Sequence, residues 1–410
     1  MTIVEFYDKA DIENVAGAIL CNPEKIILVG GTKTKMNRSK DVYMSILSKR
    51  GINSQIECRV IGKNNLNNIY NLLEEIVLNE QDCVFDLTGG DDLYLVAVGR
   101  IIEKYRDKIQ CHRFNFMNNM LYDCDTDGRV LSTAHFHITA EENIGIYGGK
   151  IVWDNTREFY TYPWDFNDEF ARDIDRMWSV CRKHPGQWNV EIGVIGMICA
   201  LFGDESTLKY SLNKAEVLAA LEENGIQYTH FSWITDQLEE FGLLNDVNMA
   251  DRIEFEFKNE QIKRSLTIEG QVLELVIARN LIDLKDEDGS PFYQDVMVGA
   301  VIDWDFADND TIKTLNEIDI IAMKDAIPVF VSCKNGKFDV NELYKLYTVS
   351  ERFGGKYVKK VLVCSRLGSL GPNSVLLRAR MQDMGIKCVD NICFLSHENV
   401  SDVVKTFWNS

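Results

Sequence analysis

The stretch that decides the fold is Thr314–Gly336, TLNEIDIIAMKDAIPVFVSCKNG. Its apolar residues alternate with polar ones and predict two adjacent β-strands. In the first strand Glu317 and Asp319 share one face, while Ile318 and Ile320 point the other way into a core. The pattern therefore predicts two carboxylates side by side on one strand.

The second strand of this stretch brings a lysine to the same place. Ser332 and Lys334 share one of its faces and flank Cys333, which faces the opposite side as inert core. Two carboxylates can hold a divalent cation through oxygen ligands. A lysine beside that cation can orient a nucleophilic water or neutralise charge that develops on a phosphate. The two strands together predict a metal-dependent phosphodiesterase site.

The elements around this stretch follow a recognisable order. They read as a helix, a strand, the two strands above, a helix, a strand and a helix: Ile268–Leu281, Asp295–Trp304, then Val340–Arg352, Lys360–Cys364 and Ser374–Met384. This order resembles the PD-(D/E)xK nuclease core, in which a helix glutamate, a strand aspartate and a (D/E)-x-K strand bind the metal. On that resemblance Glu274, Asp319 and Lys334 match the pattern, and the backbone carbonyl of Cys333 is a further ligand.

The chain departs from that pattern at Ser332, which stands where the family has an acidic residue. Either the site is inactive or another carboxylate replaces the missing one. Glu317 lies one pleat from Asp319, roughly 6–7 Å along the strand, so its side chain can reach a shared cation. We expect an active site in which Glu317 compensates, although a lone Glu-x-Asp is more often an ordinary exposed strand start.

Composition bounds the remaining possibilities. With 410 residues, 46% hydrophobic and 26% charged, the chain has the profile of a soluble protein of two or three domains. It has no apolar run as long as a membrane span and no N-terminal signal peptide pattern. Its eleven cysteines form no C-x-x-C pair, which favours reduced cysteines in a cytoplasmic protein without membrane partners. A net charge of −19 argues against nonspecific coating of nucleic acid.

The first third of the chain alternates strand-like and helical segments. This alternation predicts a Rossmann-like parallel sheet with helices on both faces, which binds ligands beyond the carboxyl ends of its strands. Two glycine-bearing turns fall at such ends, where close backbone approach and helix N-terminal amides favour phosphate oxygens. Neither is a dinucleotide or Walker A loop, and each alone is an ordinary turn. The candidate ligand-binding residues are Gly30, Gly31, Thr32, Lys33 and Thr34 in the first turn, and Thr88, Gly89, Gly90, Asp91 and Asp92 in the second.

These two turns, joined to a C-terminal PD-(D/E)xK core, resemble the CARF-domain nucleases of type III CRISPR systems. The resemblance implies a homodimer that binds a cyclic oligoadenylate, most commonly cyclic tetra-adenylate, across its two CARF domains. It further implies that the activated protein cuts RNA or DNA in antiviral defence, with Mn²⁺ or Mg²⁺ as cofactor. A symmetric interface is also what a ligand of near two-fold symmetry requires.

The predicted domain boundaries follow from these segments. They are 1–137 for the CARF domain, 138–260 for a middle module and 261–410 for the nuclease domain. Ile138–Trp153 reads as a hairpin that turns near Gly148 and Gly149, and short helices with a final strand predict a winged-helix-like module after it. The acidic surface of this module favours a structural spacer over a DNA reader, and its tryptophans are interpreted as core and interface packing.

Two alternative functions stay open at this point. One is a nucleotide-sensing, DNA-binding regulator whose nuclease domain has lost metal binding through Ser332. The other is a ring nuclease that degrades its own cyclic activator in the N-terminal pocket through Lys33 and neighbouring hydroxyls. The order of Glu274, Asp319 and Lys334 favours the metal-dependent nuclease.

Overall fold

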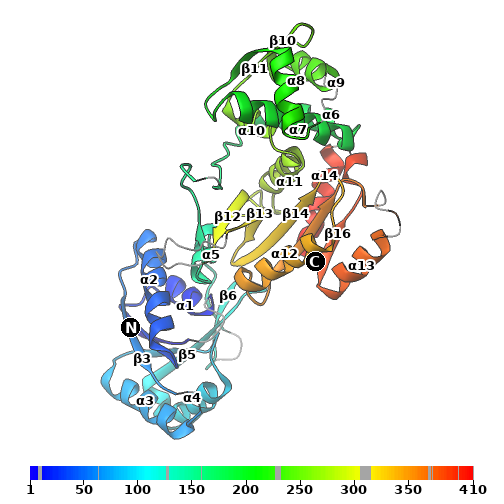
Figure 1. Cartoon of the computed structure of the whole chain (residues 1–410). Helices are drawn as coiled ribbons and strands as arrows, with labels where there is room; N and C mark the ends of the chain where they lie inside the picture. Colours follow the sequence, from blue (N-terminus) through cyan, green and yellow to red (C-terminus); the bar gives the residue numbers. More distant parts are fainter. Residues whose placement is uncertain are drawn as a thin grey trace.

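The computed structural model describes residues 1–7, 12–62, 64–125, 129–157, 159–226, 232–304, 315–367, 371, 373–395 and 397–409. Thr314, where the deciding stretch begins, lies outside these ranges. The chain is elongated, with its N-terminal sheet at one end, a small module of helices and a three-stranded sheet at the other, and a second large sheet between them (Figure 1). Among the described helices, none is both long and apolar enough to cross a membrane.

The N-terminal sheet has seven strands in the order β3-β2-β1-β4-β5-β6-β7. The first five are parallel, and the last two pair antiparallel. The strands are β1 Thr2–Phe6, β2 Lys25–Gly30, β3 Gln55–Val60, β4 Cys83–Asp86, β5 Ile109–Asn115, β6 Met120–Asp123 and β7 Val130–Ser132. The helices are α1 Glu13–Cys21, α2 Lys33–Lys49, α3 Leu66–Asn79, α4 Asp92–Tyr105 and the 3₁₀ turn Arg106–Lys108.

Helices cover both faces of this sheet, as the alternating sequence pattern predicted. Val15 of α1 and Tyr43 of α2 are buried in one core cluster, and Leu73 of α3 and Ala97 of α4 in another. Buried apolar runs such as KIILVG of β2 are typical of strands covered on both sides. The predicted Rossmann-like fold is confirmed.

The segment Ile138–Trp153 is not a hairpin, so that prediction is wrong. Thr139 begins a helix, α5 Ala140–Ile146, because its side chain accepts from the amide of Glu142 while the Glu142 carboxylate accepts from the amide of Thr139. The short strand β8 Lys150–Ile151 then joins the second large sheet. The capping box, which starts a helix, overrides the glycine pair that indicated a hairpin turn.

The second large sheet has the order β16-β15-β14-β13-β12-β8. Its strands are β12 Asp295–Asp303, β13 Leu315–Lys324, β14 Ile327–Lys334, β15 Lys359–Cys364 and β16 Ile386–Val389. β12, β13 and β14 are antiparallel, and β14, β15 and β16 are parallel. Its helices are α11 Gln271–Asp283, α12 Val340–Phe353, α13 Asn373–Asp383 and α14 His397–Lys405, with 3₁₀ turns at Ile392–Phe394 and Thr406–Asn409.

Alternate residues of β14 show which helices cover which face of this sheet. Val331 is buried in one cluster with α11 and α14, whereas Phe330 is buried in the other cluster with α12 and α13. We call these two faces the α11 face and the α12 face. The predicted order of helices and strands is confirmed.

The middle module is winged-helix-like, as predicted. Its three-stranded antiparallel sheet has the order β10-β11-β9. Its elements are α6 Asp168–Cys181, α7 Pro185–Phe202, β9 Lys209–Asn213, α8 Lys214–Glu223, α9 Ser232–Glu240, β10 Leu244–Asn248, β11 Arg252–Phe257 and α10 Glu260–Ser265.

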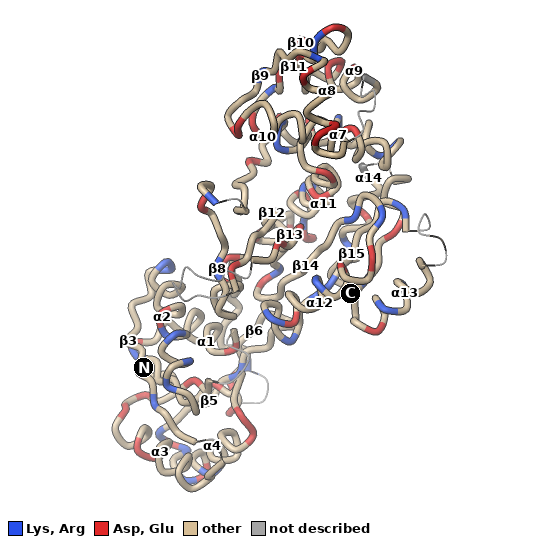
Figure 2. The backbone as a smooth tube through the Cα atoms, in the orientation of Figure 1, with Lys and Arg blue, Asp and Glu red and all other residues tan. Residues whose placement is uncertain are grey.

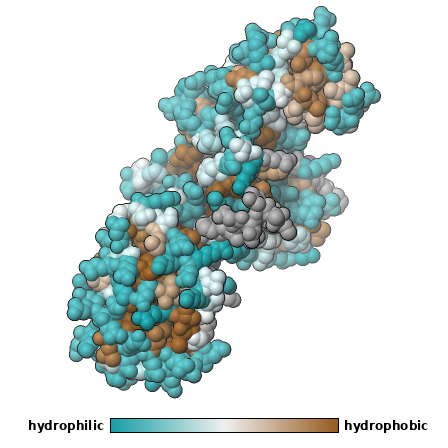
Figure 3. Space-filling view, turned by 60° about the vertical axis from the view of Figure 1, so that its left-hand side comes forward, coloured by the Kyte–Doolittle hydropathy of each residue, from teal (hydrophilic) through white to brown (hydrophobic). Residues whose placement is uncertain are grey.

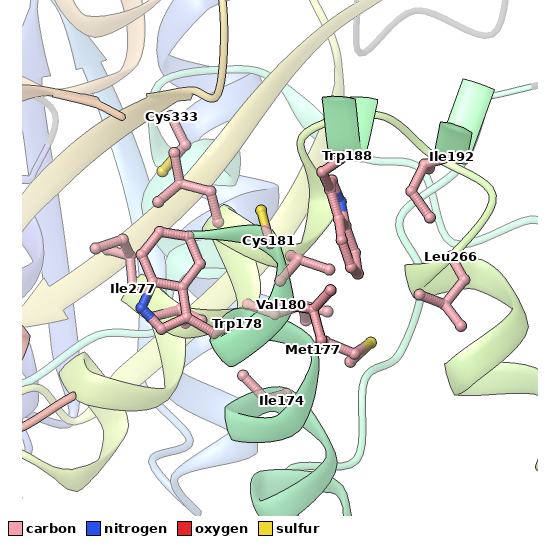
Figure 4. Close-up of a cluster of buried hydrophobic side chains, with 14 of the residues drawn as sticks. Ile174, Met177, Trp178, Val180, Cys181, Trp188, Ile192, Leu266, Ile277 and Cys333 are labelled. Atoms are coloured by element: carbon pink, nitrogen blue, oxygen red, sulfur yellow. The ribbon is translucent and has the colours of Figure 1, made fainter. Parts of the chain in front are cut away.

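This module shares a core with the second large sheet. Trp178 and Trp188 are buried in the same cluster as Ile277 of α11 and Cys333 of β14 (Figure 4). These two tryptophans therefore serve as core and interface packing, whereas Trp153 on the connecting segment is 44% exposed. Because the core is continuous, the module is packed firmly against the sheet that carries the predicted metal site.

Candidate active site and ligand pocket

The residues predicted to form a metal site come together where β13 and β14 separate. The ladder between these strands runs from Lys324–Ile327 to Ile320–Val331. Beyond that point a side chain replaces the backbone as the acceptor: Asp319 Oδ2 accepts a hydrogen bond from the Cys333 amide at 2.6 Å. The carboxylate of Asp319 therefore lies in the opening between the two strands.

Two more groups on β14 contact the same oxygen of Asp319. The Ser332 hydroxyl donates to it at 3.1 Å, and the Lys334 Nζ lies 3.7 Å away. Ser332 and Lys334 thus share a face of β14, as predicted, while the Cys333 side chain is buried in the core. Burial also raises the pKa of the Cys333 thiol well above its usual range, which suits an inert core residue.

The position of Asp319 results from a break in strand alternation that the sequence did not reveal. Val298 and Ile320 are buried on the α11 face, whereas Ala300 and Ile318 are buried on the α12 face. The prediction that Ile318 and Ile320 point the same way is therefore wrong. Gly299, opposite Asp319 in the register, has a φ of +60° that side-chain-bearing residues rarely adopt. Such an irregularity shifts the alternation by one residue and re-aims nearby side chains.

Glu274 and Glu317 complete an acidic cluster around Asp319. Glu274 lies in the first turn of α11, and removal from water raises its pKa well above the usual range, with repulsion from Asp319 and Glu317 adding to the effect. The pKa of Glu317 is also raised, first by the surrounding protein and then by Asp319. Gln271 donates to Glu274 at 2.8 Å. The three carboxylates therefore repel one another, which a bound cation would relieve.

Lys334 has a partner that the sequence analysis missed. Glu342 in the first turn of α12 pairs with its Nζ at 2.8 Å, closer than Asp319. Burial alone would lower the pKa of Lys334, but Asp319 and Glu342 outweigh it and raise that pKa. The lysine is therefore charged at neutral pH. Glu342 is the third residue of α12, six residues after Gly336, and no motif in the sequence links it to Lys334.

The cluster is not closed around a cation in this arrangement. Within the described ranges, no group of three or more His, Cys, Asp or Glu side chains is placed to hold a metal ion. Ser332, Cys333 and Lys334 hold Asp319 Oδ2 toward β14. The donor set fits a hard divalent cation in chemistry and charge, and closure requires movement of side chains.

Acidic and basic residues alternate around this opening. Acidic residues lie on α11 and β13, β14 ends in Lys334, and α12 carries acidic and basic residues alike (Figure 2). Lys345 on α12 is exposed, and its charge acts on Glu317 together with that of Arg264. The site thus combines carboxylates for a cation with cations for an anionic substrate.

The two glycine-bearing turns lie beyond β2 and β4 of the N-terminal sheet, at strand ends as predicted, and β1 lies between these two strands. Gly30 ends β2, and Thr32 stands at the N-cap position of α2 without a side-chain capping bond. Lys33 and Thr34 are exposed in the first turn of α2, as is Gly31 before it. The second turn follows β4, and Asp91 accepts from the amide of Leu93 at the start of α4 with Asp92 next to it.

The second turn is held tightly by its own side chains. Thr88 donates to Asp86 Oδ1 and accepts from the amide of Phe114 at 2.8 Å. Its hydroxyl therefore has a structural role within the turn. Gly90 has a φ of +118°, and a Cβ there would lie 3.1 Å from Phe6, while a Cβ at Gly89 would lie 3.0 Å from Glu13. Gly90 thus has a backbone conformation that side-chain-bearing residues rarely adopt, whereas a side chain at Gly89 would require Glu13 to shift.

Asp86 is itself fixed by a buried histidine. His112 Nε2 lies 3.1 Å from Asp86 Oδ2, and both side chains are buried. Burial alone would lower the pKa of His112, but the Asp86 carboxylate raises it to about 10. Burial raises the pKa of Glu5 well above its usual range, with Asp86 adding to the effect. No motif in the sequence indicated this group, whose Asp86–His112 pair positions the second turn.

The fold and these sites define a class of protein. A Rossmann-like domain with two glycine-bearing turns is joined, through a winged-helix-like module, to a nuclease-like sheet that carries three acidic residues and a lysine. The resemblance to CARF-domain nucleases is confirmed by comparison with known proteins. Residues 234–403 match the family described as Card1-like, endonuclease domain.

Solved structures share this fold over the whole chain. Protein VC1899 from Vibrio cholerae has a TM-score of 0.71 at 15% identity, with 100% of this chain and 97% of that chain covered. Can2 from Sulfobacillus thermosulfidooxidans, solved in complex with cyclic tetra-adenylate, has a TM-score of 0.67 at 14% identity, with 100% and 99% covered. The search of curated proteins found no match.

Proposed function

We propose that this protein is a metal-dependent nuclease activated by cyclic oligoadenylate, with cyclic tetra-adenylate as the activator, in type III CRISPR defence. The observation that carries the nuclease part is the meeting of Glu274, Glu317 and Asp319 with Lys334 at the opening between β13 and β14. The Card1-like endonuclease match over the same region supports it. The fold shared with Can2 supports the activator.

Each residue of the site has a proposed role. Glu274, Glu317, Asp319 and the Cys333 carbonyl would hold Mg²⁺ or Mn²⁺. The bound cation would stabilise charge on the phosphate and generate hydroxide from water near neutral pH. Lys334, charged by virtue of its acidic neighbours, neutralises charge that develops on the phosphate in the transition state. Ser332 orients Asp319 through its hydroxyl.

A homodimer is the assembly that fits the activator. A cyclic ligand of near two-fold symmetry is matched by an interface that presents the same turns twice. Leu95 and Val96 of α4 are 38% and 51% exposed, directly after the second turn. Apolar side chains at that position suit burial against a second copy, and the hydropathy surface shows hydrophobic patches over the N-terminal part (Figure 3). All eleven cysteines are free, which supports a cytoplasmic location.

Helix α5 provides the connection through which activator binding would reach the nuclease sheet. Arg50, after the last turn of α2, donates to both carboxylate oxygens of Glu142 on α5, at 2.6 and 2.8 Å. Burial alone would raise the pKa of Glu142, but Arg50 holds it below its usual range. Because α2 begins at the first ligand-type turn, movement of that turn is transmitted along α2 to α5.

The other side of α5 contacts the nuclease sheet. Asn143 donates to the Phe353 carbonyl at 2.8 Å, and Asp295 of β12 accepts from the amide of Ala140 at 2.7 Å. β8, which follows α5, pairs with the end of β12. A cavity of about 200 Å³ lies between α2, α5 and β8 and leaves room for small shifts. α5 therefore joins two rigid sheets by a few specific bonds, a suitable place for a two-state coupling.

The coupling is tested by Glu142→Gln, which removes the charge from the bidentate pair, with the neighbouring Glu141→Gln as the matched control. We expect Glu142→Gln to keep its affinity for cyclic tetra-adenylate in calorimetry but to lose about 5- to 150-fold of the stimulation of cleavage, the usual range of allosteric coupling. Equal stimulation in both variants would exclude α5 as the connection.

The function itself is tested by incubating labelled RNA and DNA with and without cyclic tetra-adenylate and Mn²⁺. Cleavage that requires both additions supports the proposal and identifies the substrate. Duplex binding without cleavage under any divalent ion would favour the regulator. Degradation of cyclic tetra-adenylate by an Asp319→Ala protein would favour a ring nuclease in the N-terminal domain.

A further inference from the structure

The segment that joins α5 to the middle module runs along β12 beside the acidic cluster. Val152 donates its amide to the Val301 carbonyl at 2.9 Å, and Thr161 Oγ1 accepts from the Val301 amide at 2.9 Å. Val301 is also the partner of Glu317 in the β12–β13 ladder. The connecting segment therefore lies along one edge of β12 at Val301, and β13 with Glu317 lies along the other edge.

Two tyrosines of this segment hold an arginine from α10. The guanidinium carbon of Arg264 lies 4.9 Å from the ring centre of Tyr160 and 4.7 Å from that of Tyr162. Its Nη1 donates to the Tyr160 hydroxyl at 3.1 Å. Stacking of this kind fixes the plane of a guanidinium group while leaving its outer N–H groups available.

The hydrogen bonds of Arg264 are incomplete. Its Nε is buried and has no hydrogen-bond partner among the described residues, and no carboxylate of those residues forms an ion pair with it. The carboxylate of Glu205 reaches the Tyr160 hydroxyl instead, at 3.1 Å. An arginine without a carboxylate partner keeps its positive charge available for an anionic ligand.

Arg264 is on the same side of the sheet as Glu317. Val301 and Tyr160 form a small buried cluster against which Tyr162 and Leu315 pack. Leu315 lies two residues before Glu317 on β13, so their side chains share a face. The surrounding protein and Asp319 raise the pKa of Glu317, and the charges of Lys345 and Arg264 act in the opposite direction, which agrees with this proximity.

We propose that Arg264, held flat by Tyr160 and Tyr162, binds a backbone phosphate of the nucleic-acid strand next to the one that is cut. This inference rests on the proposed nuclease function and assigns Arg264 a positioning role, since it does not contact the metal site. A chain with a net charge of −19 repels nucleic acid overall, so a strand needs fixed cations beside the carboxylates.

The test measures binding of fluorescein-labelled single-stranded and duplex oligonucleotides by anisotropy, with EDTA to prevent cleavage and cyclic tetra-adenylate present, across a KCl series. Arg264→Gln is compared with Arg252→Gln, a control on β11 whose guanidinium already bonds Glu254 and Ser211. We expect Arg264→Gln to weaken binding about 10- to 100-fold. The slope of log affinity against log salt should fall by about 0.7 on a single strand or about 0.9 on a duplex.

Arg264→Lys keeps the charge. If Arg264→Gln fails to fold, as judged by circular dichroism, Arg264→Lys tests whether Arg264 binds a phosphate. It should keep the wild-type salt slope but bind more weakly, because it lacks the planar fork. An unchanged slope in a folded Arg264→Gln protein, or an unchanged affinity in Arg264→Lys, overturns the inference. Cleavage by the wild type distinguishes the cases: if the wild type cuts and these variants behave like it, only the role of Arg264 is wrong.

Discussion

The contacts of Asp319 lead to a prediction that separates its structural role from its chemical one. Asp319 Oδ2 accepts from the buried Cys333 amide at 2.6 Å, at the point where the β13–β14 ladder ends. Asp319→Ala removes that acceptor, whereas Asp319→Asn keeps an oxygen in the same place and loses only the charge. We therefore expect the alanine variant, and not the asparagine variant, to loosen β14.

The size of the effect follows from the cost of a buried amide without a partner, about 1–3 kcal/mol. Since a tenfold change in an equilibrium corresponds to about 1.4 kcal/mol, local opening should become about 5- to 150-fold more frequent in Asp319→Ala than in Asp319→Asn. Hydrogen exchange measured on the peptide that contains Cys333 reports this opening directly. The peptide that covers β11, in the middle module, serves as the internal control.

The rate of cleavage, unlike hydrogen exchange, should not distinguish Asp319→Ala from Asp319→Asn. Both variants lose a carboxylate that is proposed to hold the cation, and the loss of one such transition-state contact costs roughly 10²–10³-fold in rate. Equal exchange rates in the two variants would refute the structural argument. Near wild-type cleavage by either variant would remove Asp319 from the mechanism.

Three further predictions concern the two sites. Glu317→Gln should reduce cleavage severely and raise the metal concentration required, whereas Ser332→Ala, which removes one bond to Asp319, should do much less; the opposite ranking in a metal titration would show that Glu317 does not compensate for Ser332. Glu274 has a raised pKa in the folded protein, so its ionisation costs stability as the pH rises through that pKa. Glu274→Gln should therefore abolish cleavage but raise the melting temperature at pH 8, and this gain in melting temperature should vanish towards pH 4.5. An equal shift of the melting temperature at all pH values would contradict this. Lys33→Ala should weaken cyclic tetra-adenylate binding about tenfold in calorimetry and leave maximal cleavage at saturating activator unchanged, with the exposed Lys337→Ala as control; an unaltered affinity would exclude Lys33 from the pocket.

The sequence by itself determined the elements and the order of the chemistry-bearing residues. Apolar alternation in Thr314–Gly336 predicted β13 and β14 because side chains of a strand alternate with a period of two. The same reasoning predicted the parallel N-terminal sheet and placed both glycine-bearing turns at the ends of its strands. These properties depend on residues that are near one another in the chain, which a sequence shows directly.

Only the tertiary structure decided how those residues are used. The pairing of Glu342 with Lys334 and of Asp86 with His112 depends on which elements pack together, and no local pattern encodes it. The segment before β8 became a helix because a capping box outweighed a glycine pair. The alternation of β12 and β13 slips at Gly299, where a left-handed backbone turns Asp319 into the opening between strands. The site is thus formed by long-range packing, whose energy arises between residues far apart in the sequence.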